Sequence, residues 1–167
     1  LSETAQVENG IKTLVAMHNK TGALAHRRTR PRHRHRVVVG QRLGVHNYFK
    51  YFQGFGFTDI TGIDLPGEAS PQYYKEKQYG IVELSSASFG QTNSLTPIQV
   101  CTGLCAIANG GTLLKPYVVS EVRDADGKVV QKNSRTAVRQ VISEDTSKKV
   151  CKMMKAVVDE GTGKNGR

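Results

Sequence analysis

The stretch that decides the fold is residues 84–111, which read LSSASFGQTNSLTPIQVCTGLCAIANGG. Thr96 stands where a helix N-cap belongs, and Pro97 follows at the first helical position, where its missing N–H removes no hydrogen bond. The apolar residues after it are too many for one stripe, which is typical of a helix covered on most sides; they stand at 98, 100, 101, 104, 105, 107 and 108. Asn-Gly-Gly at 109–111 supplies left-handed residues that end the helix. We therefore predict a buried helix here.

Several motifs around this helix occur in the order and spacing of a known family. A small polar run, then FGQ, then TPIQ and a helix that ends in ANGG resemble the transpeptidase domain of penicillin-binding proteins. RLGVHNYFKYFQGFGFTDITGIDLPGEA, at 42–69, is similar to the segment before that helix in the same family. KPYVVSEVRDADGKVV at 115–130 and VISEDTSKKVCKMMKAVVDEGTG at 141–163 continue the match. The resemblance covers residues 37–166, or four fifths of the chain.

The resemblance implies an α/β (α+β) fold, with helices packed on an antiparallel sheet. It also implies the chemistry of a peptidoglycan D,D-transpeptidase, in which the serine of a Ser-x-x-Lys motif attacks a D-alanyl carbonyl and forms an acyl-enzyme. The family's Ser-x-Asn and Lys-Thr-Gly motifs complete proton transfer and hold the substrate, and penicillins stop at the acyl-enzyme. The parent is then expected to cross-link stem peptides, to bind β-lactams and to be anchored by a transmembrane segment. Its expected location is the cell envelope, at the outer face of the cytoplasmic membrane.

The three catalytic motifs of the family are missing from their expected places. No Ser is followed by Lys three residues on, and no Ser is followed by Asn two residues on. Lys-Thr-Gly at 20–22 precedes all the matched blocks and is interpreted as a chance turn, while Thr-Leu-Leu-Lys at 112–115 begins with Thr. Gly-Thr-Gly at 161–163 matches only the approach to the family's Lys-Thr-Gly strand. The sequence thus names no catalytic, substrate-binding or metal residue and no cofactor, and it predicts a chain that does not turn over.

Positive charge is concentrated near the start of the chain. The formal net charge is +10; residues 1–36 carry eight Lys or Arg against two acids, and residues 37–167 carry sixteen against twelve. Six Arg and three His fall within residues 26–36, HRRTRPRHRHR. Three interpretations stay open: a disordered solvated tract, an arm that binds an anionic polymer or nucleic acid, or codons read out of frame. Nucleic acid is the less favoured partner, because no aromatic residues are interleaved for stacking.

The expected domain division follows from this charge distribution and from the resemblance. Residues 1–36 form an atypical N-terminal segment, and residues 37–167 form the middle-to-late part of a transpeptidase domain. At 167 residues the chain is shorter than the family's domain, so the resemblance implies a fragment. No apolar run reaches the length that spans a bilayer. Loss of the last strand of the sheet leaves apolar surface and a strand edge uncovered, so we expect a fragment that is marginally stable or prone to associate.

Two pairs of reactive side chains have a structural interpretation. Cys101 and Cys105 lie one turn apart in the apolar helix, where we expect buried thiols that behave as small hydrophobes. A metal site there is disfavoured because no His lies within fifty residues of the pair. Asp64 and Glu68 lie in a loop rich in Gly and Pro at 58–71, and without a sign of raised pKa values we expect solvent-facing carboxylates rather than an acid–base pair.

The chain before the central helix is predicted to be helical and then irregular. Two helical pieces over residues 37–52 are broken at Gly44. The aromatic residues of the second piece share one face and are expected in the core; they are Tyr48, Phe49 and Phe52. The loop at 58–71 follows, with a short extended piece at 63–65. Residues 72–83 show no clear period.

The chain after the central helix alternates as strands and closes with a helix. Residues 117–123 and 128–131 are predicted to form a hairpin around the turn Asp-Ala-Asp-Gly, and residues 138–142 a third strand. Ser143 then caps a helix whose acidic first turn suits the helix macrodipole. Its methionines are expected in the core and its lysines on a solvated face.

Overall fold

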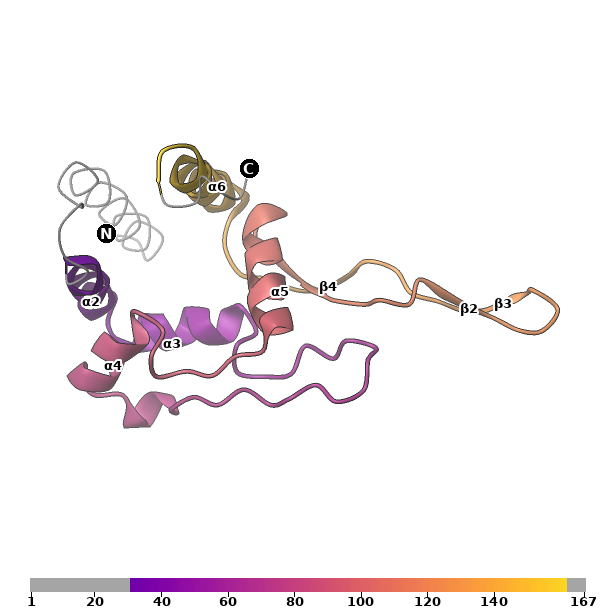
Figure 1. The fold of residues 1–167 in the computed structure, drawn as a ribbon, viewed down its shortest axis with the longest axis horizontal. Coiled ribbons are helices and arrows are strands. Elements are labelled where there is room, and N and C mark those ends of the chain that lie inside the picture. Colours follow the sequence, from indigo (N-terminus) through magenta and orange to yellow (C-terminus); the bar gives the residue numbers. More distant parts are fainter. Residues whose placement is uncertain (1–30, 162–167) are drawn as a thin grey trace.

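The structure is a computed structural model and describes residues 31–161. The helices gather at one end of the molecule, and the β2–β3 hairpin extends away from them at the other (Figure 1). The elements are α2 (Pro31–Leu43), α3 (Val45–Gly54), the 3-10 helix η1 (Glu76–Gln78), α4 (Ile81–Ala87), α5 (Pro97–Ala108), β1 (Thr112–Lys115), β2 (Glu121–Arg123), β3 (Val129–Lys132), β4 (Thr136–Gln140) and α6 (Glu144–Asp159). This confirms helices with antiparallel strands, although the strands form two separate pairs rather than one sheet.

Helix α5 has the boundaries that its sequence predicts. The Thr96 hydroxyl accepts a hydrogen bond from the Gln99 N–H at 3.3 Å, and the Gln99 side-chain oxygen accepts one from the Thr96 N–H at 2.9 Å. This reciprocal pair is a capping box, which satisfies two N–H groups at the start of the helix. At the other end only Gly110 and Gly111 are left-handed, because the C-cap residue Asn109 has a φ of −100°. The prediction of three left-handed residues is therefore wrong for Asn109.

One side of α5 is exposed, contrary to the prediction of a helix covered on most sides. Ala106 is fully buried, whereas Val100 is 42% and Leu104 is 47% exposed. Cys101 and Cys105 are exposed as well, so the prediction of buried thiols is wrong. The physical reason is that β1, α6 and the loop after α3 pack against α5 from one side and leave the other side open.

Helix α2 begins inside the basic tract. Pro31 is its first residue, so residues 31–36 are helical rather than disordered. Proline is favoured at the first helical position and arginine is a good helix former, which accounts for the difference. Arg34 and Arg36 are exposed. Residues 1–30, which include the rest of the tract and the Lys-Thr-Gly at 20–22, lie outside the described residues.

The predicted break between two helices is confirmed. Helix α2 ends at Leu43, and Gly44 adopts a φ of 78° before α3 begins. The aromatic side of α3 then packs in the core: Phe52 is 7% exposed, with its ring centroid 5.4 Å from that of Phe57 and 5.7 Å from that of Tyr73. Buried residues of α4 and its approach complete this cluster, with Val45, Tyr48 and Phe49 packed against Tyr79, Leu84 and Ala87.

Helix α4 is not predicted by the sequence. The Glu83 carboxylate accepts a hydrogen bond from the Gly80 N–H at 2.9 Å, which caps the first turn. The hydroxyls of three serines donate to carbonyls four residues earlier, within or at the end of the helix. Helix α4 packs on α2 where Gly40 lies against Ser88, so closely that a Cβ at Gly40 would lie 1.7 Å from the Ser88 Oγ. This tertiary contact, rather than helix propensity, stabilises α4.

The strands differ from the prediction in detail. Strand β1 pairs antiparallel with β4, and β2 pairs antiparallel with β3 around the predicted turn. Strand β1 covers the Thr-Leu-Leu-Lys sequence, which was not expected to pair, and β4 begins two residues before the predicted third strand. The predicted loop at 58–71 is present, but it holds no strand at 63–65.

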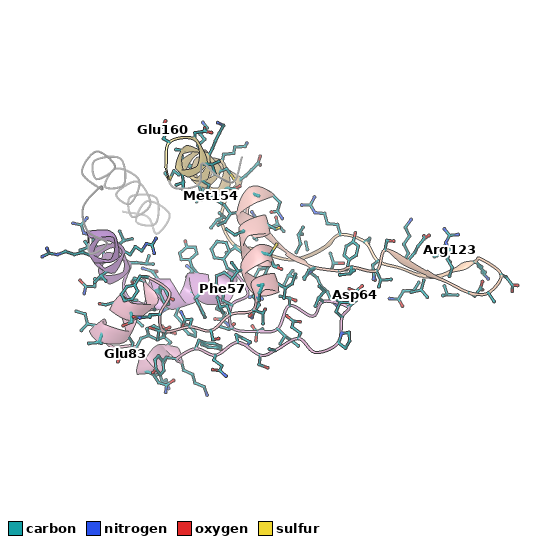
Figure 2. All side chains as sticks on the ribbon, viewed as in Figure 1. Phe57, Asp64, Glu83, Arg123, Met154 and Glu160 are labelled. Carbon is teal, nitrogen blue, oxygen red and sulfur yellow. The ribbon has the colours of Figure 1, made fainter. Side chains whose placement is uncertain are left out.

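Helix α6 has the predicted cap and charged face. The Ser143 hydroxyl accepts a hydrogen bond from the Thr146 N–H at 3.2 Å. Lysines pair with acids one turn away, which confirms a solvated face; these pairs are Lys148–Glu144, Lys149–Asp145 and Lys155–Asp159. Met153 is half-buried, but Met154 is 40% exposed, so the core assignment is wrong for Met154 (Figure 2). None of the helices in the described part of the chain is long and apolar enough to cross a bilayer.

Candidate functional site

The segment that leads into α5 is held by a polar network around Asn93. The Asn93 amide donates to the Tyr48 hydroxyl at 2.8 Å, and the Tyr79 hydroxyl donates to the Asn93 side-chain oxygen at 3.1 Å. Burial raises the pKa of Tyr48 and that of Tyr79, so both phenols stay neutral at physiological pH. Backbone hydrogen bonds between Gln72 and Ser94 fix the same segment from its other side. The network positions the backbone and leaves no free base.

Gln99 connects the start of α5 to the loop that follows α3. Its side chain is buried, with 1% of the residue exposed, and its Nε2 donates to the Asp59 carbonyl at 2.7 Å. A buried amide is tolerated only when its polar atoms have partners, and here both ends have one. The capping role of Gln99 could be predicted from the sequence, because Thr-x-x-Gln is a capping-box pattern. The hydrogen bond to the Asp59 carbonyl could not be predicted, because Asp59 is forty residues away.

The carboxylates of Asp64 and Glu68 bind backbone amides. Glu68 accepts hydrogen bonds from the N–H groups of Thr61 and Gly62, at 2.6 and 3.0 Å. Burial acts to raise the pKa of Glu68, but these amide hydrogen bonds outweigh it and the pKa is lowered. The prediction of a solvent-facing carboxylate is therefore wrong for Glu68. Its side chain is half-buried, and the carboxylate binds the backbone at the other end of the 61–68 loop. A general acid needs a raised pKa, so an acid–base role is not supported.

Asp64 holds the base of the β2–β3 hairpin. Its two oxygens accept from the N–H groups of Val118 and Val119, at 2.7 and 2.9 Å. The Asn133 amide, at the other side of the hairpin base, donates to Asp64 at 3.2 Å and to the Val119 carbonyl at 2.8 Å. The hydrogen bond from Val118 is the main reason that the pKa of Asp64 is lowered. Asp64 is exposed, as predicted, and its hydrogen bonds add a positioning role that the sequence did not indicate (Figure 2).

We expect Asp64→Asn to loosen the hairpin base. Amide hydrogen exchange at Val118 and Val119 should accelerate, because the variant replaces a charged acceptor by a weaker neutral one. In the wild type the pKa of Asp64 is lower in the folded state than its ordinary value of 3.8. The ionised carboxylate therefore stabilises the folded state fully above pH 3.8, and this stabilisation is lost as the pH falls through the folded-state pKa. Asp126→Asn, at an exposed turn position of the same hairpin, is the control that removes the same charge. Equal exchange rates of the Val118 and Val119 amides in the two variants would contradict a positioning role for Asp64.

Four serine hydroxyls in and near α4 and in α6 donate to backbone carbonyls. Those of Ser85, Ser86 and Ser88 donate to carbonyls within α4. The Ser147 hydroxyl donates to the Ile107 carbonyl at 2.5 Å. None of these hydroxyls donates to a side-chain base, which a serine nucleophile requires. That the chain contains no catalytic serine stays a prediction.

The Thr-Leu-Leu-Lys sequence does not form a nucleophile–lysine pair. It is strand β1, and the Thr112 hydroxyl donates to the Gln140 side-chain oxygen at 2.7 Å. Residues three apart on a strand point to opposite faces, so Thr112 and Lys115 are separated. Over residues 31–161 there is also no group of three His, Cys, Asp or Glu that could hold a metal ion.

An open apolar hollow of about 510 Å³ lies where α2, α3, α4 and α5 meet. Most of its lining is aromatic or aliphatic and contains no carboxylate, lysine or histidine; it includes Phe52, Phe55, Phe57, Leu95 and Val100. Ligand sites that perform chemistry place a few convergent polar groups in such a pocket. Here the polar side chains of the lining are Asn93, Tyr48 and Tyr51, so the described part of the hollow offers no carboxylate, lysine or histidine for acid–base chemistry.

Comparison with known proteins identifies the domain. The family model described as "Penicillin binding protein transpeptidase domain" matches residues 35–167. Stage V sporulation protein D of Bacillus subtilis (strain 168) is 45% identical over 130 residues, which are 77% of this chain and 20% of that protein. Penicillin-binding protein 3 from Mycobacterium tuberculosis, solved in complex with aztreonam, has a TM-score of 0.70 at 27% identity, over 77% of this chain and 28% of that chain.

A second structure shows the same fold at lower identity. The D,D-transpeptidase domain of a peptidoglycan glycosyltransferase from Eggerthella lenta has a TM-score of 0.67 at 24% identity, over 79% of this chain and 35% of that one. The chain therefore belongs to the penicillin-binding protein transpeptidase family. It spans about a fifth of the length of the sporulation relative. The resemblance and the fold class predicted from the sequence are confirmed, while the division at residue 36 stays a prediction.

Proposed function

We propose that this chain is the middle-to-late part of the catalytic domain of a penicillin-binding D,D-transpeptidase. The intact parent cross-links peptidoglycan stem peptides through a serine acyl-enzyme and is acylated by β-lactams. The observation that carries this proposal is the family match over residues 35–167, a range that has α5 and its capping box near its middle. A relative of the same fold was solved with aztreonam, which supports the β-lactam part of the proposal. The parent acts in the cell envelope, outside the cytoplasmic membrane, and is anchored by a segment outside this chain.

In this proposal the chain supplies scaffold and another part of the parent supplies the nucleophile. The sequence has neither Ser-x-x-Lys nor Ser-x-Asn. The serines of α4 use their hydroxyls on backbone carbonyls. A hydroxyl without a neighbouring base is a poor nucleophile, so the chain by itself is expected to be inactive.

Labelling with a fluorescent penicillin tests both parts of the proposal. The chain alone should remain unlabelled. A chimera in which residues 37–161 replace the matching segment of the Bacillus subtilis sporulation relative should be labelled, since 45% identity favours a correct fit. Covalent labelling of the chain alone would contradict inactivity, and a folded chimera that fails to react would contradict the transpeptidase assignment.

A second candidate function is a non-catalytic relative whose basic arm binds an anionic polymer. The observation that favours it is that Arg34 and Arg36 are exposed on the first turns of α2. Binding of this kind releases counterions and weakens steeply as salt is added. Titration with an anionic polymer such as heparin over a range of salt concentrations discriminates it, because the transpeptidase proposal predicts no such salt-dependent affinity.

A further inference from the structure

Two exposed thiols lie one turn apart on helix α5. Cys101 and Cys105 are both free and exposed. Residues four apart on an α-helix lie on the same face, with Cβ atoms about 5–6 Å from each other. Desolvation raises the pKa of Cys105, and the neighbouring Cys101 raises it further through its charge and a hydrogen bond. The two side chains therefore form one cluster, which we call the α5 dithiol.

The helix keeps the two sulfur atoms from forming a disulfide with each other. A disulfide needs Cβ atoms about 3.5–4.5 Å apart, which is closer than one turn of a regular helix places them. The capping box of Thr96 and Gln99 fixes the first turn of α5, so the spacing along the helix is set before any ligand binds. The α5 dithiol thus presents two reduced thiols at a fixed separation.

The separation suits a single metal ion between the two sulfur atoms. Metal–thiolate bonds are about 2.3 Å long, so an ion in line between two sulfurs holds them about 4.6 Å apart. Cysteines whose Cβ atoms are about 5–6 Å apart reach this sulfur distance by rotation about χ1. Both side chains are exposed, which leaves room for that rotation.

The number of available ligands decides which ion fits. Zinc takes at least three protein ligands, and residues 31–161 contain no group of three His, Cys, Asp or Glu that could hold it. The lack of a nearby histidine, which disfavours zinc, does not disfavour Cu(I), a soft ion that thiolates select and that two thiolates hold in a line. Val100 and Leu104 flank the pair, are 42% and 47% exposed, and add no ligand.

We propose that Cys101 and Cys105 form a binding site for one Cu(I) ion, which is held by their two thiolates. On binding, each thiol releases its proton to solvent and its sulfur forms a bond to copper. The copper stays Cu(I), so the step consumes no oxidant or reductant. The site goes beyond the proposed transpeptidase function and does not depend on it, because both ligands belong to this chain.

Competition with a coloured Cu(I) chelator under anaerobic conditions tests the site in the full chain. The wild type should take up one Cu(I) per chain and gain the ultraviolet absorption of copper–thiolate bonds. Cys101→Ser and Cys105→Ser should each weaken binding at least about 100-fold, because even the loss of a group that only hydrogen-bonds a metal ligand costs about 10–100-fold. Cys151→Ser, which removes the thiol of α6, is the matched control and should leave the affinity unchanged.

Variants that move one thiol along the helix test the spacing. In the Cys105→Ser background, Leu104→Cys places a thiol three residues from Cys101 on the same face and should restore tight binding. Thr102→Cys in that background restores the number of thiols but places them on adjacent residues, which do not face each other, and should not restore binding. Far-UV circular dichroism should show wild-type helix content in every variant, so that a loss of binding reports on coordination.

Three results would overturn the proposal. Binding that stays tight in either single serine variant would show that the two thiolates are not the ligands. Sedimentation velocity that finds two chains on one copper would place the ligands on different molecules. Uptake by the wild type that is no stronger than that of the Cys101→Ser/Cys105→Ser double variant would show that α5 holds no copper site. None of these results bears on penicillin labelling, so the copper site and the transpeptidase assignment fail separately.

Discussion

Gln99→Ala should lower the free energy of unfolding by about 3 kcal/mol. The residue is 1% exposed, so the truncation leaves a cavity at the start of α5. It also removes the partners of the Asp59 carbonyl and the Thr96 N–H, which lie at 2.7 and 2.9 Å from the Gln99 side chain. A buried polar group without a partner costs about 1–3 kcal/mol, and the cavity adds to this.

Urea denaturation followed by far-UV circular dichroism measures this change. Gln131→Ala is the matched control, because Gln131 is exposed on strand β3 and its truncation should change the free energy of unfolding by less than about 0.5 kcal/mol. If the two variants unfold alike, Gln99 does not fix α5 to the loop after α3. A variant of Gln99 that is unfolded without denaturant would be consistent with a marginally stable fragment, and its refolding in an osmolyte would then provide the comparison.

Gly111→Ala should lower the free energy of unfolding by about 3 kcal/mol or more, from two combined causes. Gly111 has a φ of 95°, where residues with a Cβ are strained. A Cβ there would lie 2.0 Å from the Ile142 carbonyl oxygen, so the β1–β4 edge would have to move. The same backbone is bonded across this contact, because the Gly111 carbonyl accepts from the Val141 N–H at 2.8 Å. The substitution therefore strains the connection of α5 to both β1 and α6.

Gly127→Ala separates the two causes. Gly127 has a similar φ of 81° in the hairpin turn, but no atom lies within 4 Å of a Cβ built there. The Gly127→Ala substitution should lower the free energy of unfolding by about 1 kcal/mol, which is the cost of placing a Cβ on a backbone of positive φ. Thermal unfolding of the two variants side by side measures the difference. Equal losses of unfolding free energy in the two variants would mean that the contact between a Cβ at position 111 and the Ile142 carbonyl relaxes at no cost.

Both substitutions act at the ends of the same helix. Gln99 fixes the first turn of α5 and Gly111 fixes the chain just after its last turn, so together they set the direction of the helix.

Local sequence determined the features whose cause is local. Helix α5 begins at Pro97 because Thr96 and Gln99 form a capping box, and each of these residues is within four positions of the others. The break at Gly44 and the cap at Ser143 follow in the same way from one residue and its neighbours. The family motifs are also contiguous in the sequence, which is why membership could be recognised before the fold was known.

Tertiary structure alone decided the features that depend on distant partners. Helix α4 contains two serines in its last turn and a third at its C-cap and has weak propensity, yet it forms because Gly40 of α2 admits Ser88 at close range. Asp64 is solvent-facing as predicted, but its role at the hairpin base could not be predicted, because the amides that it binds are more than fifty residues away. The apolar count of α5 predicted a covered helix, but an apolar pattern records only that a surface avoids water. Which polypeptide covers that surface depends on what packs there, and residues 31–161 leave the Val100–Leu104 face open.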